Sequence, residues 1–410
     1  MTSNATEAFV WIWLPGTSLP VVAGRIEKHG LLHHFTYGRS YRERDDAIAL
    51  SPFELALQAG SFQPVGMNTI HSCLRDAAPD AWGRRVVGYQ YPDLAADELD
   101  YLLLSGSDRI GALDFQASAT EYVPRESDHP TLDDLLQAAE LLEASRPLPP
   151  EPEHALLHGT SIGGARPKAL IDHEGKYFIA KFGSSTDVYA VVKAEYIAMS
   201  LAALAGLTVA PVSLTSSLGK DVLVIERFDR IDTTTGKARR LMLSGLSLLE
   251  LNEMEARYAS YSDLADRVRQ RFTDPQATLA ELYRRLVFNV LVGNTDHARN
   301  HSAFWDGRQL ILTPAYDICP QLRTGQEATQ AMDIGGVAGN AATLTNVLSV
   351  CGKFQLRESD ARTMIEQLIA AVEDNWISVC EEAGLVTVER DRLWGRALLN
   401  PYCIQNWKSA

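Results

Sequence analysis

A polar segment in the second half of the chain combines residue types that can accept a proton and hold a metal ion. The segment Gly293–Ser302 reads GNTDHARNHS, and Asp317 follows after two short apolar runs. A carboxylate beside a hydroxyl can act as a general base, and carboxylate and amide oxygens suit Mg²⁺. We therefore expect Asp296 to accept the proton of an acceptor hydroxyl, and Asn300 and Asp317 to bind Mg²⁺. This order of residues is typical of phosphoryl transfer.

Candidates for phosphate binding lie earlier in the chain. The loop Gly159–Gly164 includes Gly163 and Gly164, and glycine lets backbone N–H groups approach phosphate oxygens closely. The loop's spacing matches neither the P-loop nor the dinucleotide fingerprint. Lys181 lies in an apolar strand-like run, so its ammonium group is expected at a sheet edge or beside an anionic group. Glu195, in the middle of the next predicted helix, is the candidate for that anionic partner, as in kinases.

Two other interpretations of the polar segment remain open. Asp, Asn, Thr and Ser are common in caps and turns, so the segment could simply connect a helix to a hairpin. Asp296, His297, His301 and Asp317 could instead ligate a transition metal in a hydrolase. No H-E-x-x-H or comparable spacing supports such a metal site. The hydrolase interpretation also leaves the lysine and the glycine loop without a role.

The candidate residues depend on strands and helices that hydrophobic periodicity predicts. Strands are expected within residues 8–50 and in four later runs, 168–171, 177–182, 208–214 and 222–228. Helices are expected in short stretches before residue 143 and over 188–205, 274–293, 359–385 and 387–399. The pair Asp306-Gly307 between two apolar runs predicts a hairpin. The polar segment is therefore expected to lie between a long helix and this hairpin.

Length and charge limit the classes of protein to consider. The chain has 410 residues, more than the roughly 250–300 residues at which one hydrophobic core stops growing, so two or three domains are expected. Residues 145–153 contain four prolines, which favour an extended connector and a domain boundary. The formal net charge of −14 argues against an extended nucleic-acid surface. Any contact with DNA would therefore come through a partner.

Cysteine usage and the apolar start of the chain predict a cytoplasmic protein. The five cysteines form no C-x-x-C pair, which fits a reducing compartment. The apolar run 9–14 is too short to span a bilayer and lacks the basic flank of a signal peptide. We therefore expect no membrane association.

The chain resembles the HipA family of toxin kinases in motifs spread from the N-terminal strands toward the last helices. Each motif is modest alone, but together they are specific: Asp80–Arg85, Gly106–Leu113, Ser161–Lys168, Glu226–Arg230, Asn294–Asn300 and Pro314–Asp317. The resemblance implies an α+β fold, in which a β-rich N-terminal domain precedes a two-lobed protein-kinase-like core. The implied bounds are 1–145 for the HipA-type N-terminal domain, 146–245 for a small β-rich ATP lobe with the glycine loop, and 246–410 for a larger helical lobe with the catalytic loop.

The resemblance also implies an activity and partners. A HipA-type kinase binds ATP and Mg²⁺ and phosphorylates serine or threonine of protein substrates, aminoacyl-tRNA synthetases among them. The implied partner is a HipB-like helix-turn-helix antitoxin that neutralises the kinase and links it to operator DNA. The toxin itself would then contact DNA only indirectly.

Matching motifs imply roles for individual residues in this sequence. The roles are Lys181 for the α- and β-phosphates, Glu226 and Phe228 for the adenine, Asp296 for the acceptor hydroxyl, and Asn300 and Asp317 for the metal. His297 in the polar segment is also expected to bind the nucleotide. Ser161 falls on the family's autophosphorylated glycine-loop serine, and its modification is expected to eject the loop and lower ATP affinity.

One departure from the family pattern concerns the polar segment. The family has N-x-D-x-H-x-[KR]-N, whereas here Asp296 directly precedes His297, so the segment is one residue short. A residue spans up to about 3.5 Å, and a catalytic group must be placed within roughly 0.5 Å. An alignment anchored on His297 would put Thr295 in the base position. The alternative function is therefore a catalytically weak or silent ATP-binding partner of a DNA-bound antitoxin.

Overall fold

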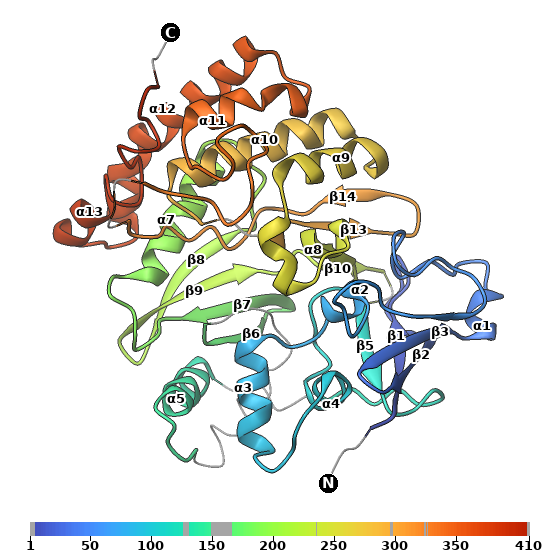
Figure 1. Cartoon of the computed structure of the whole chain (residues 1–410). Helices are drawn as coiled ribbons and strands as arrows, with labels where there is room; N and C mark the ends of the chain where they lie inside the picture. Colours follow the sequence, from blue (N-terminus) through green and yellow to red (C-terminus); the bar gives the residue numbers. More distant parts are fainter. Residues whose placement is uncertain are drawn as a thin grey trace. The chain divides into compact units, whose positions relative to one another are not determined.

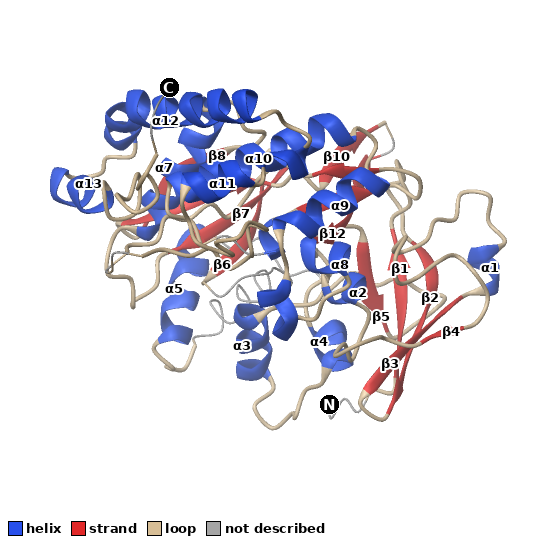
Figure 2. Ribbon diagram, turned by 45° about the horizontal axis from the view of Figure 1, so that its top comes forward, coloured by secondary structure: helices blue, strands red, loops and turns tan. Residues whose placement is uncertain are grey.

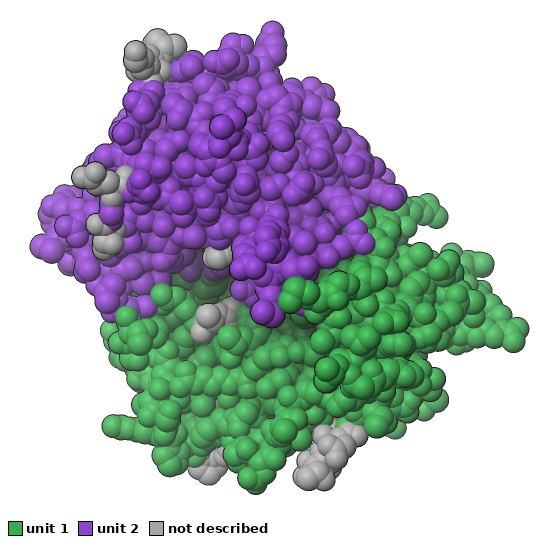
Figure 3. All heavy atoms as spheres, in the orientation of Figure 1, with its two compact units in different colours: residues 1–186, 215–243, 304–308 green, residues 187–214, 244–303, 309–410 purple. Residues whose placement is uncertain are grey.

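The computed structural model contains both helices and β-sheets with antiparallel strand pairs (Figure 1), which agrees with the predicted α+β class. The structure describes residues 5–125, 131–148, 166–234, 236–295, 298–323, 325 and 327–407. The chain forms two compact units, coloured separately in Figure 3. Unit 1 comprises residues 1–186, 215–243 and 304–308, and unit 2 comprises residues 187–214, 244–303 and 309–410.

Unit 1 begins with a five-stranded sheet in the order β4-β3-β2-β1-β5 (Figure 2). Its strands are β1 (Glu7–Ile12), β2 (Val21–His29), β3 (Leu32–Tyr37), β4 (Ser61–Phe62) and β5 (Leu113–Gln116). The neighbouring strands β1–β2, β2–β3, β3–β4 and β1–β5 all pair antiparallel. The prediction of strand to about residue 50 is wrong beyond Tyr37, because α1 (Arg39–Arg42) follows at once. There the Tyr41 hydroxyl donates to the main-chain oxygen of Ile48 and closes a compact loop.

Short helices follow this sheet, as predicted. They are α2 (Ser72–Arg75), α3 (Ala81–Gln90), α4 (Glu98–Leu104) and α5 (Leu132–Glu143). Asp97 and Thr131 begin α4 and α5 with capping boxes, in which Asp100 and Asp134 bond back to the N-cap backbone. Such caps satisfy backbone N–H groups that have no partner within the helix.

A second sheet, most of whose residues belong to unit 1, has the strand order β6-β7-β9-β8. Its strands are β6 (Lys168–His173), β7 (Lys176–Phe182), β8 (Val212–Ser217) and β9 (Lys220–Glu226). Three of them lie close to the predicted runs, whereas β8 begins four residues after the start of the predicted run 208–214. One face buries Ala180, Phe182 and Val222 against Trp82 of α3 and Leu136 of α5. The helices before residue 145 therefore pack on this sheet within one unit. The three-domain division stays a prediction.

The last strands of this region are short. They are β10 (Arg230–Thr233) and β11 (Gly236–Arg239), which pair antiparallel, and β12 (Leu241–Ser244).

Unit 2 is mainly helical, and its longest helices lie where periodicity predicts them. Its elements are α7 (Val191–Leu204), α8 (Gly245–Leu249), η2 (Glu253–Tyr258), α9 (Tyr261–Arg271), α10 (Pro275–Leu291), η3 (Ala298–Asn300), α11 (Leu344–Ser349), η4 (Cys351–Phe354), α12 (Glu358–Glu382) and α13 (Thr387–Leu393). Asp274 caps α10, and its carboxylate accepts from the N–H of Ala277. The helix predicted over 387–399 is too long, because α13 ends at Leu393.

The hairpin predicted at Asp306-Gly307 is present between β13 (Ser302–Trp305) and β14 (Leu310–Leu312). Gly307 has φ +93°, which favours glycine, and the Asp306 carboxylate accepts from the N–H of Arg308. Within the described residues, no helix is both long enough and apolar enough to cross a membrane.

Candidate functional site

Lys181 lies on β7 between two neighbouring strands. It is the register partner of Lys168 on β6 and of Leu223 on β9. Residues directly opposite in an antiparallel pair share a face, so the two lysine side chains are neighbours on the same face. Like charges in that position repel each other. This face of the sheet therefore favours an anionic group near Lys168 and Lys181.

Lys168 is a residue that the sequence analysis missed. Lys168 is buried in the structure, which is uncommon for a lysine. The signal available in the sequence was its place at the end of the Ser161–Lys168 motif, directly before an apolar run.

Glu226 lies on the opposite face of the sheet from Lys181. Its register partner on β7 is Phe178, and its carboxylate forms an ion pair of 3.3 Å with the ammonium group of Lys176. Phe228, two residues later, packs edge-on against Phe304 with 5.9 Å between ring centroids. The expected contacts of Glu226 and Phe228 with adenine stay predictions.

Glu195 occupies the middle of α7 in unit 2 and is 3% exposed. A buried carboxylate on so apolar a helix needs a charged or hydrogen-bonding partner. Lys181 belongs to unit 1, so the expected pairing of these two residues stays a prediction.

The two predicted metal ligands in unit 2 lie together. The side-chain amide nitrogen of Asn300, at the end of η3, lies 3.4 Å from the main-chain oxygen of Asp317. Asp317 has φ +59°, a left-handed conformation that Asp and Asn tolerate better than most residues. The Tyr316 hydroxyl donates to the main-chain oxygen of Arg299 over 2.7 Å and lies 2.5 Å from the Ser302 hydroxyl. Tyr316 thus holds the Arg299–Ser302 segment beside Asp317.

The beginning of the polar segment is fixed by a chain of buried amides. Asn294 donates to the side-chain oxygen of Asn289 over 3.0 Å, and Asn289 donates to the Tyr261 hydroxyl over 3.3 Å. The side-chain oxygen of Asn294 also accepts from the N–H of Cys319. The segment is therefore anchored both to α10 and to the residues after Asp317. Asn289 was missed, although an amide in the apolar helix 274–293 was a usable signal.

Thr295, the last described residue before the predicted base, contacts Arg323. The guanidinium Nη2 of Arg323 donates to the Thr295 hydroxyl over 2.9 Å, and burial lowers the pKa of Arg323. Asp296 and His297 lie outside the described residues, as do Ser161, Gly163 and Gly164. The effect of the shortened segment on the base position therefore stays a prediction.

His301 and Asp317 are the two residues of the possible hydrolase metal site that lie in the described part of the chain. Within the described ranges, no group of three or more His, Cys, Asp and Glu side chains is placed to hold a metal ion. His301 is buried and packs edge-on against Tyr261 with 5.4 Å between ring centroids. Two of the four ligands considered for a hydrolase, Asp296 and His297, lie outside those ranges.

Comparison with known proteins identifies the family. The family model described as HipA-like C-terminal domain matches residues 160–376, more than half of the chain, and the HipA N-terminal domain model matches residues 12–116. The chain belongs to the HipA family. The resemblance inferred from the motifs is therefore confirmed.

Individual HipA relatives agree with this assignment. A Sinorhizobium fredii protein named "Putative kinase Y4mE" is 31% identical over 319 residues, covering 71% of this chain and 73% of that protein. The serine/threonine-protein kinase toxin HipA of Shewanella oneidensis is 27% identical over 184 residues, covering 38% of this chain and 42% of that protein.

A solved HipA structure shares the fold. It is the complex of HipA, HipB and operator DNA from Shewanella oneidensis, which matches with a TM-score of 0.70 and 18% identity and covers 94% of this chain and 96% of that chain. The predicted HipA-type fold is thereby confirmed.

Proposed function

We propose that this HipA-family chain is a serine/threonine kinase that transfers the γ-phosphoryl group of ATP to a protein hydroxyl. The observation that carries the proposal is the contact between the side-chain amide of Asn300 and the main-chain oxygen of Asp317, in a family whose relatives are named kinases. Both side chains offer the hard oxygen atoms that Mg²⁺ prefers, so their chemistry fits the metal. Bound Mg²⁺ would neutralise negative charge on the phosphates.

The lysines of the second sheet would bind the phosphates. Lys181 and Lys168 are opposite each other in the β6–β7 register and bring two positive charges to one face. A nucleotide polyphosphate is an anion that would relieve the repulsion between them. Lys181 is proposed to contact the α- and β-phosphates, and Lys168 adds to the field that attracts them.

Asp296 is proposed as the residue that aligns the acceptor. The proton of the serine or threonine hydroxyl would pass to its carboxylate, while the hydroxyl oxygen forms a bond to the γ-phosphorus and the bond to the bridging oxygen of ADP breaks. General-base assistance of this kind contributes typically 10²–10⁴-fold in rate. Arg323 and Asn294 would hold the preceding residues in place through the contacts described above.

The proposed substrates and partner follow from the family. The acceptors are serine or threonine residues of a protein, with aminoacyl-tRNA synthetases as candidates, and Ser161 of the glycine loop. The proposed partner is a HipB-like antitoxin, as in the solved Shewanella oneidensis complex of HipA, HipB and operator DNA. With a net charge of −14, this chain is proposed to contact DNA only through that partner.

Incubation of the purified protein with γ-labelled ATP, Mg²⁺ and lysate proteins tests the proposal. We expect label on the chain itself and on a lysate protein, loss of both in Asp296→Asn, and loss of self-labelling in Ser161→Ala. The one-residue shortening of the polar segment favours a second function, a catalytically silent ATP-binding partner of an antitoxin. ATP binding without any transfer would support that second function and overturn the first.

A further inference from the structure

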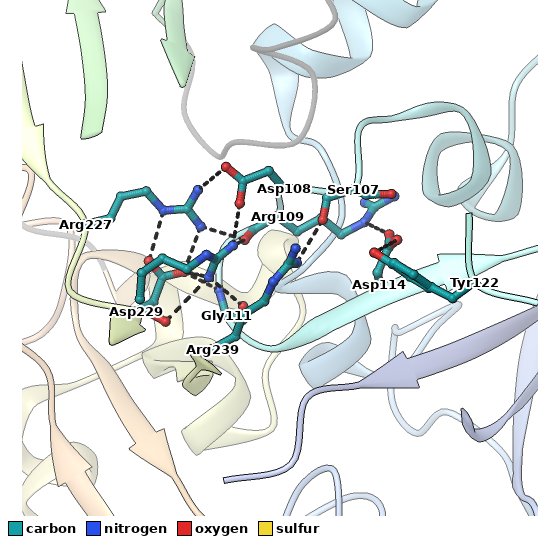
Figure 4. A network of polar contacts seen from close by, with 10 residues as sticks. Ser107, Asp108, Arg109, Gly111, Asp114, Tyr122, Arg227, Asp229 and Arg239 are labelled. Carbon is teal, nitrogen blue, oxygen red and sulfur yellow. Dashed lines mark hydrogen bonds and ion pairs between the residues drawn. The ribbon is translucent and has the colours of Figure 1, made fainter. Parts of the chain in front are cut away.

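A cluster of charged side chains joins two distant parts of unit 1 (Figure 4). We call Asp108, Arg227, Asp229 and Arg230 the arginine–aspartate cluster. Asp108 comes from the loop before β5, and the other three come from the end of β9 and the start of β10. These are the segments of two family motifs, Gly106–Leu113 and Glu226–Arg230, and no step of the proposed reaction uses their charged side chains.

Asp108 bridges the two arginines that flank Phe228 and Asp229. Its carboxylate accepts from Nη1 of Arg227 over 2.9 Å and from Nη2 of Arg230 over 2.6 Å. Asp229 binds the same two guanidinium groups: Arg227 donates to it through Nε and Nη2, and Arg230 through Nη1, over 2.8–3.0 Å. Each arginine is thus held by two carboxylates. Planar guanidinium groups held in this way have little freedom to move.

Main-chain atoms of the N-terminal region complete the cluster. The N–H of Gly111 donates to the carboxylate of Asp229 over 2.7 Å, and the Gly111 oxygen accepts from Arg230 over 3.0 Å. The main-chain oxygen of Arg109 accepts from Nη2 of both Arg227 and Arg230, over 2.7 and 2.6 Å. Hydrogen bonds from both main-chain and side-chain atoms therefore connect the loop before β5 to the 226–230 segment.

The N-terminal side of the cluster is itself held rigidly. The Arg109 guanidinium is fully buried and donates to the carboxylate of Asp114 over 2.7 Å. It also donates to the main-chain oxygens of Ala77, Leu102 and Ser105. The Arg109 oxygen that binds the two arginines is thus part of an anchored residue. A displacement of the 226–230 segment would break contacts to this fixed point.

The cluster keeps its charges despite burial. Burial by itself raises the pKa of Asp229, but the charges of Arg227 and Arg230 outweigh it and hold that pKa well below its usual range. Burial likewise disfavours the charged form of Arg227, yet Asp108 and Asp229 raise its pKa above the ordinary value. Buried ion pairs of this kind often add little net stability compared with an apolar core. We therefore expect these ion pairs to fix the conformation of the two segments rather than to raise the free energy of unfolding.

We propose that Asp108 is a positioning residue for the nucleotide base. Acting through Arg227 and Arg230, it fixes the 226–230 segment, to which the family resemblance assigns the adenine through Glu226 and Phe228. The inference rests on the proposed kinase function. It implies that the loop before β5 contributes to the selection of ATP over other nucleotides. Asp108 is not proposed to contact the nucleotide itself.

Asp108→Asn tests the proposal, because it removes one negative charge and keeps the size of the side chain. We expect KM for ATP to rise by about tenfold to a hundredfold, as for other displaced contacts, with kcat nearly unchanged. The preference for ATP over GTP should fall, since the displaced segment is the one assigned to the base. Asp108→Glu, which restores the charge, should recover part of the ATP affinity.

Asp232→Asn is the matched control. Asp232 is in the neighbouring β10 strand and pairs with Lys237, and its side chain is 81% exposed. The same chemical change there should leave KM and the nucleotide preference unchanged. Arg230→Lys provides a second test if Asp108→Asn does not fold, because it keeps the charge but loses the two-pronged contact with Asp108 and Asp229.

The outcomes separate this inference from the proposed function. Wild-type protein that neither binds ATP nor transfers phosphate overturns the proposed function, and the positioning role falls with it. Wild-type activity together with unchanged KM and unchanged ATP-to-GTP preference in folded Asp108→Asn or Arg230→Lys overturns the positioning role alone. A thermal transition measured for each variant establishes that it is folded.

Discussion

The side-chain amide nitrogen of Asn300 lies 3.4 Å from the main-chain oxygen of Asp317, seventeen residues later in the chain. An Asn that donates through its nitrogen presents its side-chain oxygen elsewhere, and this oxygen is the atom that Mg²⁺ binds. Tyr316 and Ser302 hold the two segments in the same place through their hydroxyl groups. The contact therefore places the two residues proposed as Mg²⁺ ligands side by side, although they come from separate parts of the sequence of unit 2.

Asp317→Asn should abolish most of the phosphate transfer while the fold is kept. Asn tolerates the left-handed conformation at φ +59°, so the variant removes the charge without adding backbone strain. Loss of a metal ligand worth several kcal/mol should lower the transfer rate by about a hundredfold or more. The rate measured as a function of Mg²⁺ concentration checks this, with the exposed Asp374→Asn as control. An unchanged Mg²⁺ dependence would remove Asp317 from the metal site.

Gly245→Ala should displace the polar segment, because Gly245 packs against its main chain at Ala298. A Cβ at this position would lie 2.2 Å from the main-chain oxygen of Ala298, the first residue of η3. The contact is with backbone, so the segment that carries Asn300 must shift. We expect the transfer rate to fall by about tenfold to a hundredfold. Gly352→Ala, where the added methyl would meet no atom within 4 Å, should retain wild-type transfer; equal rates for the two variants would contradict the prediction.

Asp114→Asn should strongly destabilise the chain. The carboxylate is fully buried and accepts from Arg109 over 2.7 Å and from Arg125 over 2.8 Å. The substitution leaves two guanidinium groups without a countercharge, which costs about 3–5 kcal/mol of unfolding free energy. Urea denaturation measures this loss. Asp46→Asn, which breaks an exposed pair with Arg44, should cost no more than about 1 kcal/mol, and a similar cost for both variants would refute the argument.

The stability of the chain should depend on pH through His71. Burial lowers the pKa of His71 to about 4, and among the described residues neither ring nitrogen has a hydrogen-bond partner. Unfolded histidine titrates near 6.5, so between about pH 6.5 and pH 4 the unfolded chain binds a proton that the folded chain excludes. The unfolding free energy should therefore fall as pH decreases through this window, by on the order of 1–3 kcal/mol.

His71→Phe should flatten that pH dependence, because the replacement cannot take up a proton. Denaturation at pH 7, 6, 5 and 4 measures the slope for wild type and variant. His173→Phe, at an exposed position, should keep the wild-type slope. Parallel slopes for wild type and His71→Phe would show that other groups cause the effect.

Local signals in the sequence predict much of unit 2. Asp274 and Pro275 start α10, and apolar residues at helical spacing carry it to Leu291. The Asp306-Gly307 pair predicts its hairpin for the same reason, since turn chemistry is decided by the turn residues themselves. The expectation that Asn300 and Asp317 bind one metal ion also predicts that the two residues lie close together, as they do.

Long-range contacts between charged residues could not be predicted. Charged side chains are usually exposed, so nothing local marks Arg109 or Arg227 as fully buried. The hydrogen bond between Gly111 and Asp229 joins residues 118 positions apart. The strand prediction fails after Tyr37 for a related reason: Tyr41 and Leu50 are apolar and buried, but they close a loop through the Tyr37 and Tyr41 hydroxyls.

We propose that Lys181 and Asp317 both contribute to binding of the same Mg·ATP. Calorimetric titration of Mg·ATP into wild type, Lys181→Met and Asp317→Asn tests this proposal most directly. We predict one binding site in the wild type and clearly weaker binding of Mg·ATP in both variants. Wild-type affinity retained in either variant would contradict the claim.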